Sequence, residues 1–338
     1  MKKDPRILVL KLATVALVLV YLVIAAGAVV RATGSGMGCP DWPKCFGHLI
    51  PSTDSSSLPE GYRKLYVEKR KAKNERMASL LRFFGADELA QKILDDPSIY
   101  TELGFNAKKA WIEYVNRLLG VLLGLVQFIL VIAAWMYRKQ NAKIFWFSIL
   151  AILLTILEGW LGSLVVSTNL LPGTITIHMF LALGIMVLMT SIIVKLKNAA
   201  AGRSAPLIKK IIFFAVILSL AQIYMGTRVR EQVDMIATHF DNRSEWIGAL
   251  DHYFDLHRIM ALAVLVLNGS IFYKLRKCEG ELKYFSRSLI CVVIFEMIAG
   301  FSLSFFSLPA LVQPVHLILA VMMFGAQVSL VYRFRSQW

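Results

Sequence analysis

Histidines within long apolar segments are the residues of this sequence most able to carry chemistry. Three of the six histidines, His178, His257 and His316, lie in such segments, and an ionisable side chain inside a membrane helix marks a functional candidate. Two neutral imidazoles at similar depth in one helix bundle can ligate a haem iron from both sides. We therefore predict a bis-histidine haem between His257 and His316, against the alternative of buried histidines that hydrogen-bond to neighbouring helices.

An internal repeat gives these histidines matched positions. A glutamate, a glycine, a proline and a histidine recur in the same order as Glu158, Gly162, Pro172, His178 and as Glu296, Gly300, Pro309, His316. The glutamate precedes the histidine by 20 residues in both stretches. Either glutamate can be a structural carboxylate paired with a neighbour or part of a proton route.

The two copies differ at one position that matters for metal binding. His178 is the counterpart of His316, but the counterpart of His257 is Asn116. An amide is a poor iron ligand, so a haem in the first half would keep one axial position weak or open, as chemistry at the iron requires. Glu113, on the same helical face as Asn116, is either an acid or base at this pocket or a helix-start acid paired with Arg117.

Four arginines also recur, one near the outer end of each of four segments. GAVVR ends at Arg31 and matches GTRVR ending at Arg230, while EYVNR ends at Arg117 and matches FDLHR ending at Arg258. Their positions fit binding of haem propionates, with Arg31 and Arg117 assigned to the pocket of the first half. The competing interpretation is that arginine side chains extend to the membrane interface.

Two cysteines lie in the outer segment GCPDWPKCFG, where oxidation is permitted. Cys39 and Cys45 are predicted to form a disulfide, and a redox-active pair is the weaker alternative. Cys278 and Cys291 fall on the inner side and are expected to stay reduced. We find no Cys/His pattern typical of another metal site.

The elements that must position these residues are membrane helices. Hydrophobic residues make up 57% of the 338, charged residues only 17%, and the net charge is +15, a combination that excludes an ordinary soluble domain or a nucleic-acid binder. Apolar runs long enough to span a bilayer occur near residues 8–30, 113–136, 143–166, 175–194, 211–229, 252–273, 288–308 and 311–332. Lys and Arg gather in the connections of one side, so both termini are predicted to be cytoplasmic.

These segments predict an all-α polytopic protein built as two tandem four-helix bundles in parallel orientation. The first domain is expected at 1–195, including an outer loop at 31–112, and the second at 196–338. Within that loop, Tyr66 to Asp95 is charged with apolar residues at helical spacing. This pattern predicts one or two amphipathic helices outside the bilayer. They would form a peripheral cap or, as the alternative, a docking or oligomerisation element.

Several motifs together resemble the haem A synthase family over nearly the whole chain, except an insertion at about 51–108. They are RATGSGMGCPDWPKCFG, WIEYVNRLLGVLLG, GSLVVSTNLLPGTITIH, GTRVRE, LHR and PVHLILA. The resemblance implies an eight-helix inner-membrane enzyme that oxidises the C8 methyl of haem O to a formyl group and so supplies haem A to terminal oxidases. It implies haem b as electron-transfer cofactor at His257 and His316, substrate haem at His178 and a catalytic Glu113. This sequence departs from the family at Asn116, where the family's E-x-x-H motif has histidine.

The same resemblance implies partners in haem O synthase, a farnesyltransferase, and in terminal oxidase assembly, besides the membrane lipid. The electron acceptor and the oligomeric state stay open, a homo-oligomer included. The main rival is a diheme membrane cytochrome of the b type, which needs no open coordination position and is disfavoured by Asn116. A transporter or assembly scaffold would explain the intramembrane glutamates but not histidines at matched spacing.

Overall fold

The chain forms a helical membrane protein in the computed structural model, which describes residues 4–83, 85–95, 97, 101, 104–167, 173–197, 206–237, 239–240, 242–278 and 280–335. Eight described helices are long and apolar enough to cross a membrane. They are α1 (Pro5–Ala32), α4 (Ala107–Tyr137), α5 (Ala142–Ser167), α6 (Thr174–Lys197), α7 (Pro206–Ile236), α8 (His252–Leu275), α9 (Glu281–Phe305) and α10 (Val312–Arg335). The eight predicted spans are thus confirmed. Pro172 of the repeat lies outside the described residues.

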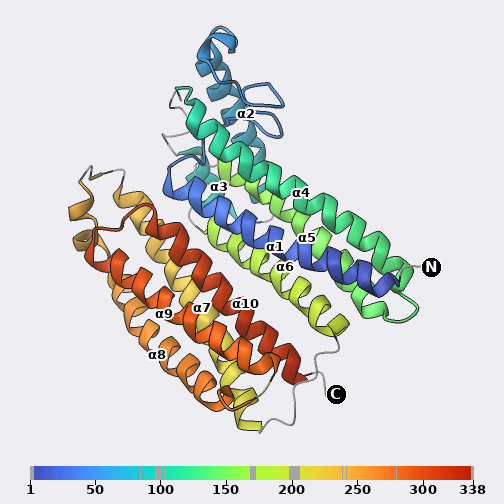
Figure 1. Ribbon diagram of the computed structural model, residues 1–338. Helices are drawn as coiled ribbons and strands as arrows, with labels where there is room; N and C mark the ends of the chain where they lie inside the picture. Colours follow the sequence, from blue (N-terminus) through green and yellow to red (C-terminus); the bar gives the residue numbers. More distant parts are fainter. Residues whose placement is uncertain are drawn as a thin grey trace.

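The helices are arranged as two groups of four that lie side by side (Figure 1). Helices α1, α4, α5 and α6 form one group and α7 to α10 the other, with α1 and α6 packed against α10 and α6 also touching α7. Both chain ends lie at the same end of the bundle (Figure 1), as an even number of spans requires. This arrangement is consistent with two tandem copies of one four-helix unit.

An apolar core continues across the seam between the two groups. Met186 of α6 and Phe324 of α10 are almost fully buried in one hydrophobic cluster with residues of α1 and α4. Gly325 of α10 permits this close approach, because a Cβ there would lie 2.1 Å from the Tyr21 hydroxyl and 2.9 Å from the Met186 sulfur. The two groups therefore pack as tightly on each other here as helices do within a domain.

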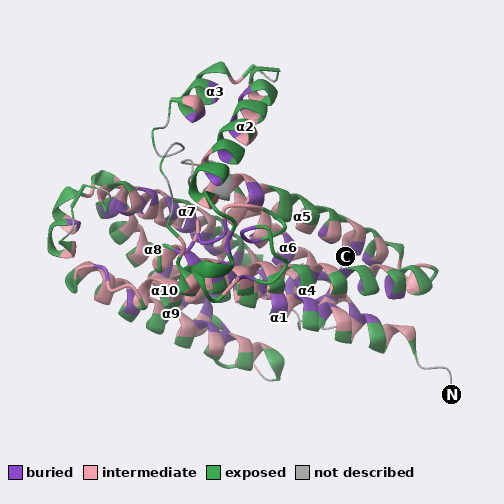
Figure 2. Cartoon of the chain, turned by 90° about the horizontal axis from the view of Figure 1, so that it is seen from above, coloured by how far each residue is buried: buried purple, intermediate pink, exposed green. Residues whose placement is uncertain are grey.

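The outer segment after α1 folds into a cap with two helices, α2 (Tyr62–Phe83) and α3 (Asp87–Leu94). Figure 2 shows both projecting from the bundle and exposed along most of their length. Ile93 of α3 packs on Met77 and Leu81 of α2. The predicted amphipathic helices are confirmed, and the described residues contain no strand, only an isolated bridge between Cys45 and His48.

Aromatic packing and one half-buried lysine fix the cap to the bundle. The Phe46 ring packs edge to face on the rings of Tyr62, Tyr66 and Phe105, with distances between ring centres of 5.8, 5.3 and 5.3 Å. Lys73 of α2 donates from Nζ to the carbonyl of Ser163 in α5 at 2.8 Å. Burial, with a smaller effect from the Arg117 charge nearby, lowers the pKa of Lys73. The cap is thereby fixed over the α4–α5 side of the molecule.

Candidate functional site

The second group of helices, with parts of α1 and α6, lines a cavity of about 980 Å³ that includes both predicted ligands, His257 and His316. Their ring centres are 6.2 Å apart. Each ring packs against a glycine of a neighbouring helix: a Cβ on Gly226 would lie 3.3 Å from Cε1 of His257, and a Cβ on Gly300 would lie 3.3 Å from Cε1 of His316. The structure therefore brings the two histidines together from α8 and α10 and uses two glycines to admit their rings.

One of the two imidazoles has a carboxylate partner. Nδ1 of His316 lies 3.1 Å from Oε1 of Glu296 in α9, which leaves Nε2 as the nitrogen free to bind a metal in the cavity. Glu296 is thus paired with a neighbouring side chain, which is one of the two roles expected from the sequence. His257 is held through its backbone instead, because the Gln222 amide donates to the His257 carbonyl at 2.9 Å.

Arginines gather at the rim of this cavity. Arg258 and Arg230 line it, as the repeat predicted for the second half, but so does Arg31 of α1. Asp234 joins two of them, at 2.5 Å from Arg31 and 2.6 Å from Arg230. Arg31 had been assigned to the first half; the structure places it at the second cavity, because α1 lies along the seam and directs this side chain across it.

The first group repeats the same contacts, with a closer histidine–glutamate pair and looser glycine contacts. Nδ1 of His178 lies 2.6 Å from Oε2 of Glu158. A Cβ on Gly162 would lie 3.9 Å from Cε1 of His178, and a Cβ on Gly27 would lie 3.9 Å from Oδ1 of Asn116. Asn116 therefore occupies the place that His257 has in the other half, and its buried Oδ1 has no hydrogen-bond partner among the described residues.

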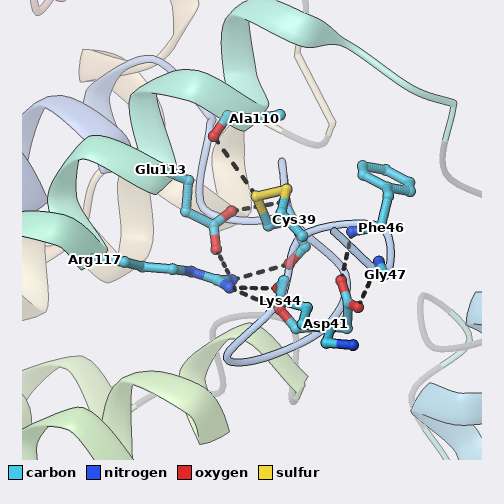
Figure 3. Close-up of a disulfide and its surroundings, with 9 residues drawn as sticks. Cys39, Asp41, Lys44, Phe46, Gly47, Ala110, Glu113 and Arg117 are labelled. Atoms are coloured by element: carbon cyan, nitrogen blue, oxygen red, sulfur yellow. Dashed lines mark hydrogen bonds and ion pairs between the residues drawn. A yellow bond between two sulfur atoms is a disulfide. The ribbon is translucent and has the colours of Figure 1, made fainter. Parts of the chain in front are cut away.

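Glu113 and Arg117 hold the outer loop against α4 (Figure 3). Glu113 is 3% exposed; it accepts from the backbone N–H of Cys39 at 2.9 Å and pairs with Arg117. Arg117 donates to the carbonyls of Asp41, Lys44 and Cys39 at 2.7, 3.1 and 3.1 Å. The i,i+4 pairing was foreseen from sequence, whereas the contact with the loop was not.

The predicted disulfide between Cys39 and Cys45 closes this loop. The loop lies directly on the first turn of α4, with Sγ of Cys39 3.6 Å from the carbonyl of Ala110. Two carboxylate oxygens of the loop residue Asp41 accept from Phe46 N at 2.6 Å and Gly47 N at 2.9 Å. The loop is thus compact, and the Glu113–Arg117 pair holds it against α4.

Sequence reasoning missed the role of the four glycines. Gly27 and Gly226 had been seen only as the start of the repeated GAVVR and GTRVR motifs, and Gly162 and Gly300 only as markers of the repeat. Their fixed spacing to the arginines and histidines was the available signal. The structure shows that each one faces a ligand position on the next helix.

Comparison with known proteins gives a consistent result. The model of a family described as cytochrome oxidase assembly protein matches residues 11–77 and 86–328. A Heme A synthase of Alkalihalophilus pseudofirmus is 25% identical over 73% of this chain and 69% of its own, and one of Halalkalibacterium halodurans is 24% identical over 81% and 78%. A Heme A synthase of Shewanella oneidensis is 28% identical over 49% of this chain, and the match spans only 38% of that relative.

Proposed function

Because the chain belongs to the family of cytochrome oxidase assembly proteins, we propose that it is a haem A synthase that oxidises the C8 methyl of haem O to a formyl group. The relatives named Heme A synthase support this assignment. The observation that carries it is the asymmetry of two matched sites: two facing histidines in one half, and His178 opposite Asn116 in the other. One site suits a resident cofactor and the other a substrate.

The residues of the second half fit a haem b. His257 and His316, whose ring centres lie 6.2 Å apart, would hold the haem iron between them through imidazole nitrogens, which are common haem ligands. The cavity volume of about 980 Å³ lies within the range of cofactor pockets. Arg258, Arg230 and Arg31 at the rim supply charge for propionates. When bound, this haem would supply electron transfer.

In the first half the chain would hold the substrate from one side. Glu158 fixes Nδ1 of His178 and so presents Nε2 to the substrate iron. Asn116 offers an amide where a second imidazole would close the site. Glu113 is our candidate acid or base, acting one helical turn outward of Asn116 from a position fixed by Cys39 and Arg117.

The protein is a multi-pass membrane protein, and we propose that it lies in the cell inner membrane with both termini in the cytoplasm. This orientation puts the disulfide loop on the oxidising side, which is where disulfides persist. Haem O synthase would supply the substrate and terminal oxidase assembly would receive the product.

Pigment analysis after co-expression with a haem O synthase tests the function. Wild-type protein is expected to accumulate haem A, and His178→Ala is expected to abolish it while His257 and His316 still hold haem b. Bound haem b without new pigment in the wild type would instead favour a b-type cytochrome and refute the proposal.

Glu113→Gln separates the two roles of that residue. The amide keeps the shape and an acceptor for the Cys39 N–H, so the loop should stay in place. Loss of haem A with haem O binding retained supports an acid or base role. Loss of haem O binding together with faster proteolysis of the loop would assign Glu113 to the clamp alone.

A further inference from the structure

The first turn of α6 is held by residues of the other half of the molecule. The backbone N–H of Gly173, just before α6, donates to Oε1 of Glu231 in α7 at 2.9 Å. The Thr176 hydroxyl lies 2.9 Å from Oγ1 of Thr227 and 3.2 Å from Oε1 of Glu231. Since the Thr227 hydroxyl donates to the carbonyl of Tyr224 at 2.8 Å, Thr227 accepts from Thr176. Two residues of α7 therefore fix the start of α6.

Glu231 is suited to this role by its burial and its partners. It is 6% exposed, and its second oxygen, Oε2, accepts from Arg228 at 2.6 Å. The first N–H groups of a helix lack intrahelical partners and carry partial positive charge, so a carboxylate stabilises them. Here the carboxylate comes from a neighbouring helix, which makes the position of the α6 terminus depend on α7.

The same turn of α6 contributes to both candidate haem sites. His178 faces Gly162 and Glu158 of α5, while Ile175 and Met179 line the cavity of the second half. One turn of α6 therefore lies between the two candidate sites.

The α7 side of this junction reaches the other site directly. Thr227 lines the second cavity and follows Gly226, which packs against His257. A displacement of α6 against α7 would thus move His178 relative to both its own site and the haem b cavity.

We propose that Glu231 and Thr227 are positioning residues for His178, so that the substrate site of the first half is completed by α7 of the second half. The proposal rests on the proposed function, because it takes His178 as a ligand of the substrate haem. Neither residue touches the substrate; both act through the first turn of α6. The substrate half is accordingly incomplete without its partner half.

The test is a titration of purified, detergent-solubilised full-length protein with haem O, followed by absorption and electron paramagnetic resonance spectroscopy. Haem bound through His178 opposite Asn116 should be high-spin, and haem between His257 and His316 low-spin, so the two sites are read separately. Glu231→Ala is expected to weaken the high-spin site about tenfold or more, because it removes a charged acceptor from the start of α6, and to leave the low-spin signal unchanged.

Three further variants keep the test decisive. Thr227→Val keeps the volume and removes one hydrogen bond, so it should weaken the high-spin site about fivefold even if Glu231→Ala does not fold. Glu245→Ala removes an exposed acid of the loop after α7 and should change neither signal. Glu231→Gln, which still accepts from Gly173, should recover part of the affinity.

The outcomes separate this inference from the proposed function. Unchanged high-spin binding in Glu231→Ala and Thr227→Val, or an equal loss at both sites, would overturn the positioning role. A wild-type protein with no high-spin haem at all would instead contradict the assignment of the substrate site. Selective loss of the high-spin site supports the proposal.

Discussion

Replacing Gly226 by alanine is expected to weaken the haem b site without destabilising the fold. The new Cβ would lie 3.3 Å from Cε1 of His257, whereas carbon atoms pack best at about 3.5–4.0 Å. The His257 ring must therefore move by a few tenths of an ångström. Crowding of this kind costs about 1–3 kcal/mol, which corresponds to roughly 5- to 150-fold weaker haem binding. Gly300→Ala should act equally on His316, where the distance is also 3.3 Å.

The first half provides matched controls for this experiment. Gly162→Ala and Gly27→Ala place the Cβ at 3.9 Å from His178 and Asn116, which is ordinary contact, so binding at either site should change little. Alanine is the better helix former by about 1 kcal/mol, which offsets part of the crowding at Gly226 and Gly300, so thermal stability should stay close to that of the wild type in all four variants. The assay is the amount of low-spin haem retained per protein after purification. Equal loss of haem in the Gly226 and Gly162 variants would refute the reasoning from ring contact.

Three other predictions follow from single contacts. Asn116→His should convert the high-spin haem of the first half to low-spin by adding a second imidazole; a wild-type spectrum with two low-spin haems would contradict the open position. Gly38→Ala should detach the outer loop from α4, measured by limited proteolysis, because a Cβ there would lie 2.5 Å from the Lys109 carbonyl group; Gly120→Ala, which meets nothing within 4 Å, is the control. Burial, helped by the Asp41 charge, raises the pKa of Tyr66 to about 12, above its unfolded value of about 10. Unfolding therefore releases a proton from Tyr66 in this range, and the free energy of unfolding of the cap should fall as pH rises from about 10 to about 12. Phenolate absorbance during alkaline unfolding follows the ionisation of Tyr66, and Tyr66→Phe should remove this part of the pH dependence.

The helices and the matched histidines could be read from the sequence because both depend on local pattern. A bilayer-length apolar run fixes a helix whatever its neighbours, and a duplicated Glu-to-His spacing fixes two equivalent positions. The disulfide between Cys39 and Cys45 was similarly local, because its partners are only six positions apart.

The contacts that the sequence did not reveal depend on which helices are neighbours in space. Arg31 was assigned by the repeat to its own half, yet α1 lies on the seam, so this side chain pairs with Asp234 of the other half. Glu113 accepts a hydrogen bond from the N–H of Cys39, which lies 74 residues away, and no sequence pattern predicts this contact. Glu231 has no charged counterpart in the first repeat, where Ala32 occupies the equivalent place, so only the packing of α6 on α7 reveals it.

The differences between the two halves correspond to what a cofactor and a substrate each require. In the second half both ligand rings sit 3.3 Å from the position of a glycine Cβ, whereas in the first half the corresponding distances are 3.9 Å. The side chain of His178 is 39% exposed and that of His316 is 24% exposed. A resident haem is bound more tightly by two strong ligands whose rings are closely packed. A substrate haem must enter, react and leave, and two such ligands would release it too slowly. Asn116 and the looser glycine contacts weaken the first site at its ligand and at its packing, and the contacts from α7 keep His178 in place despite that looseness.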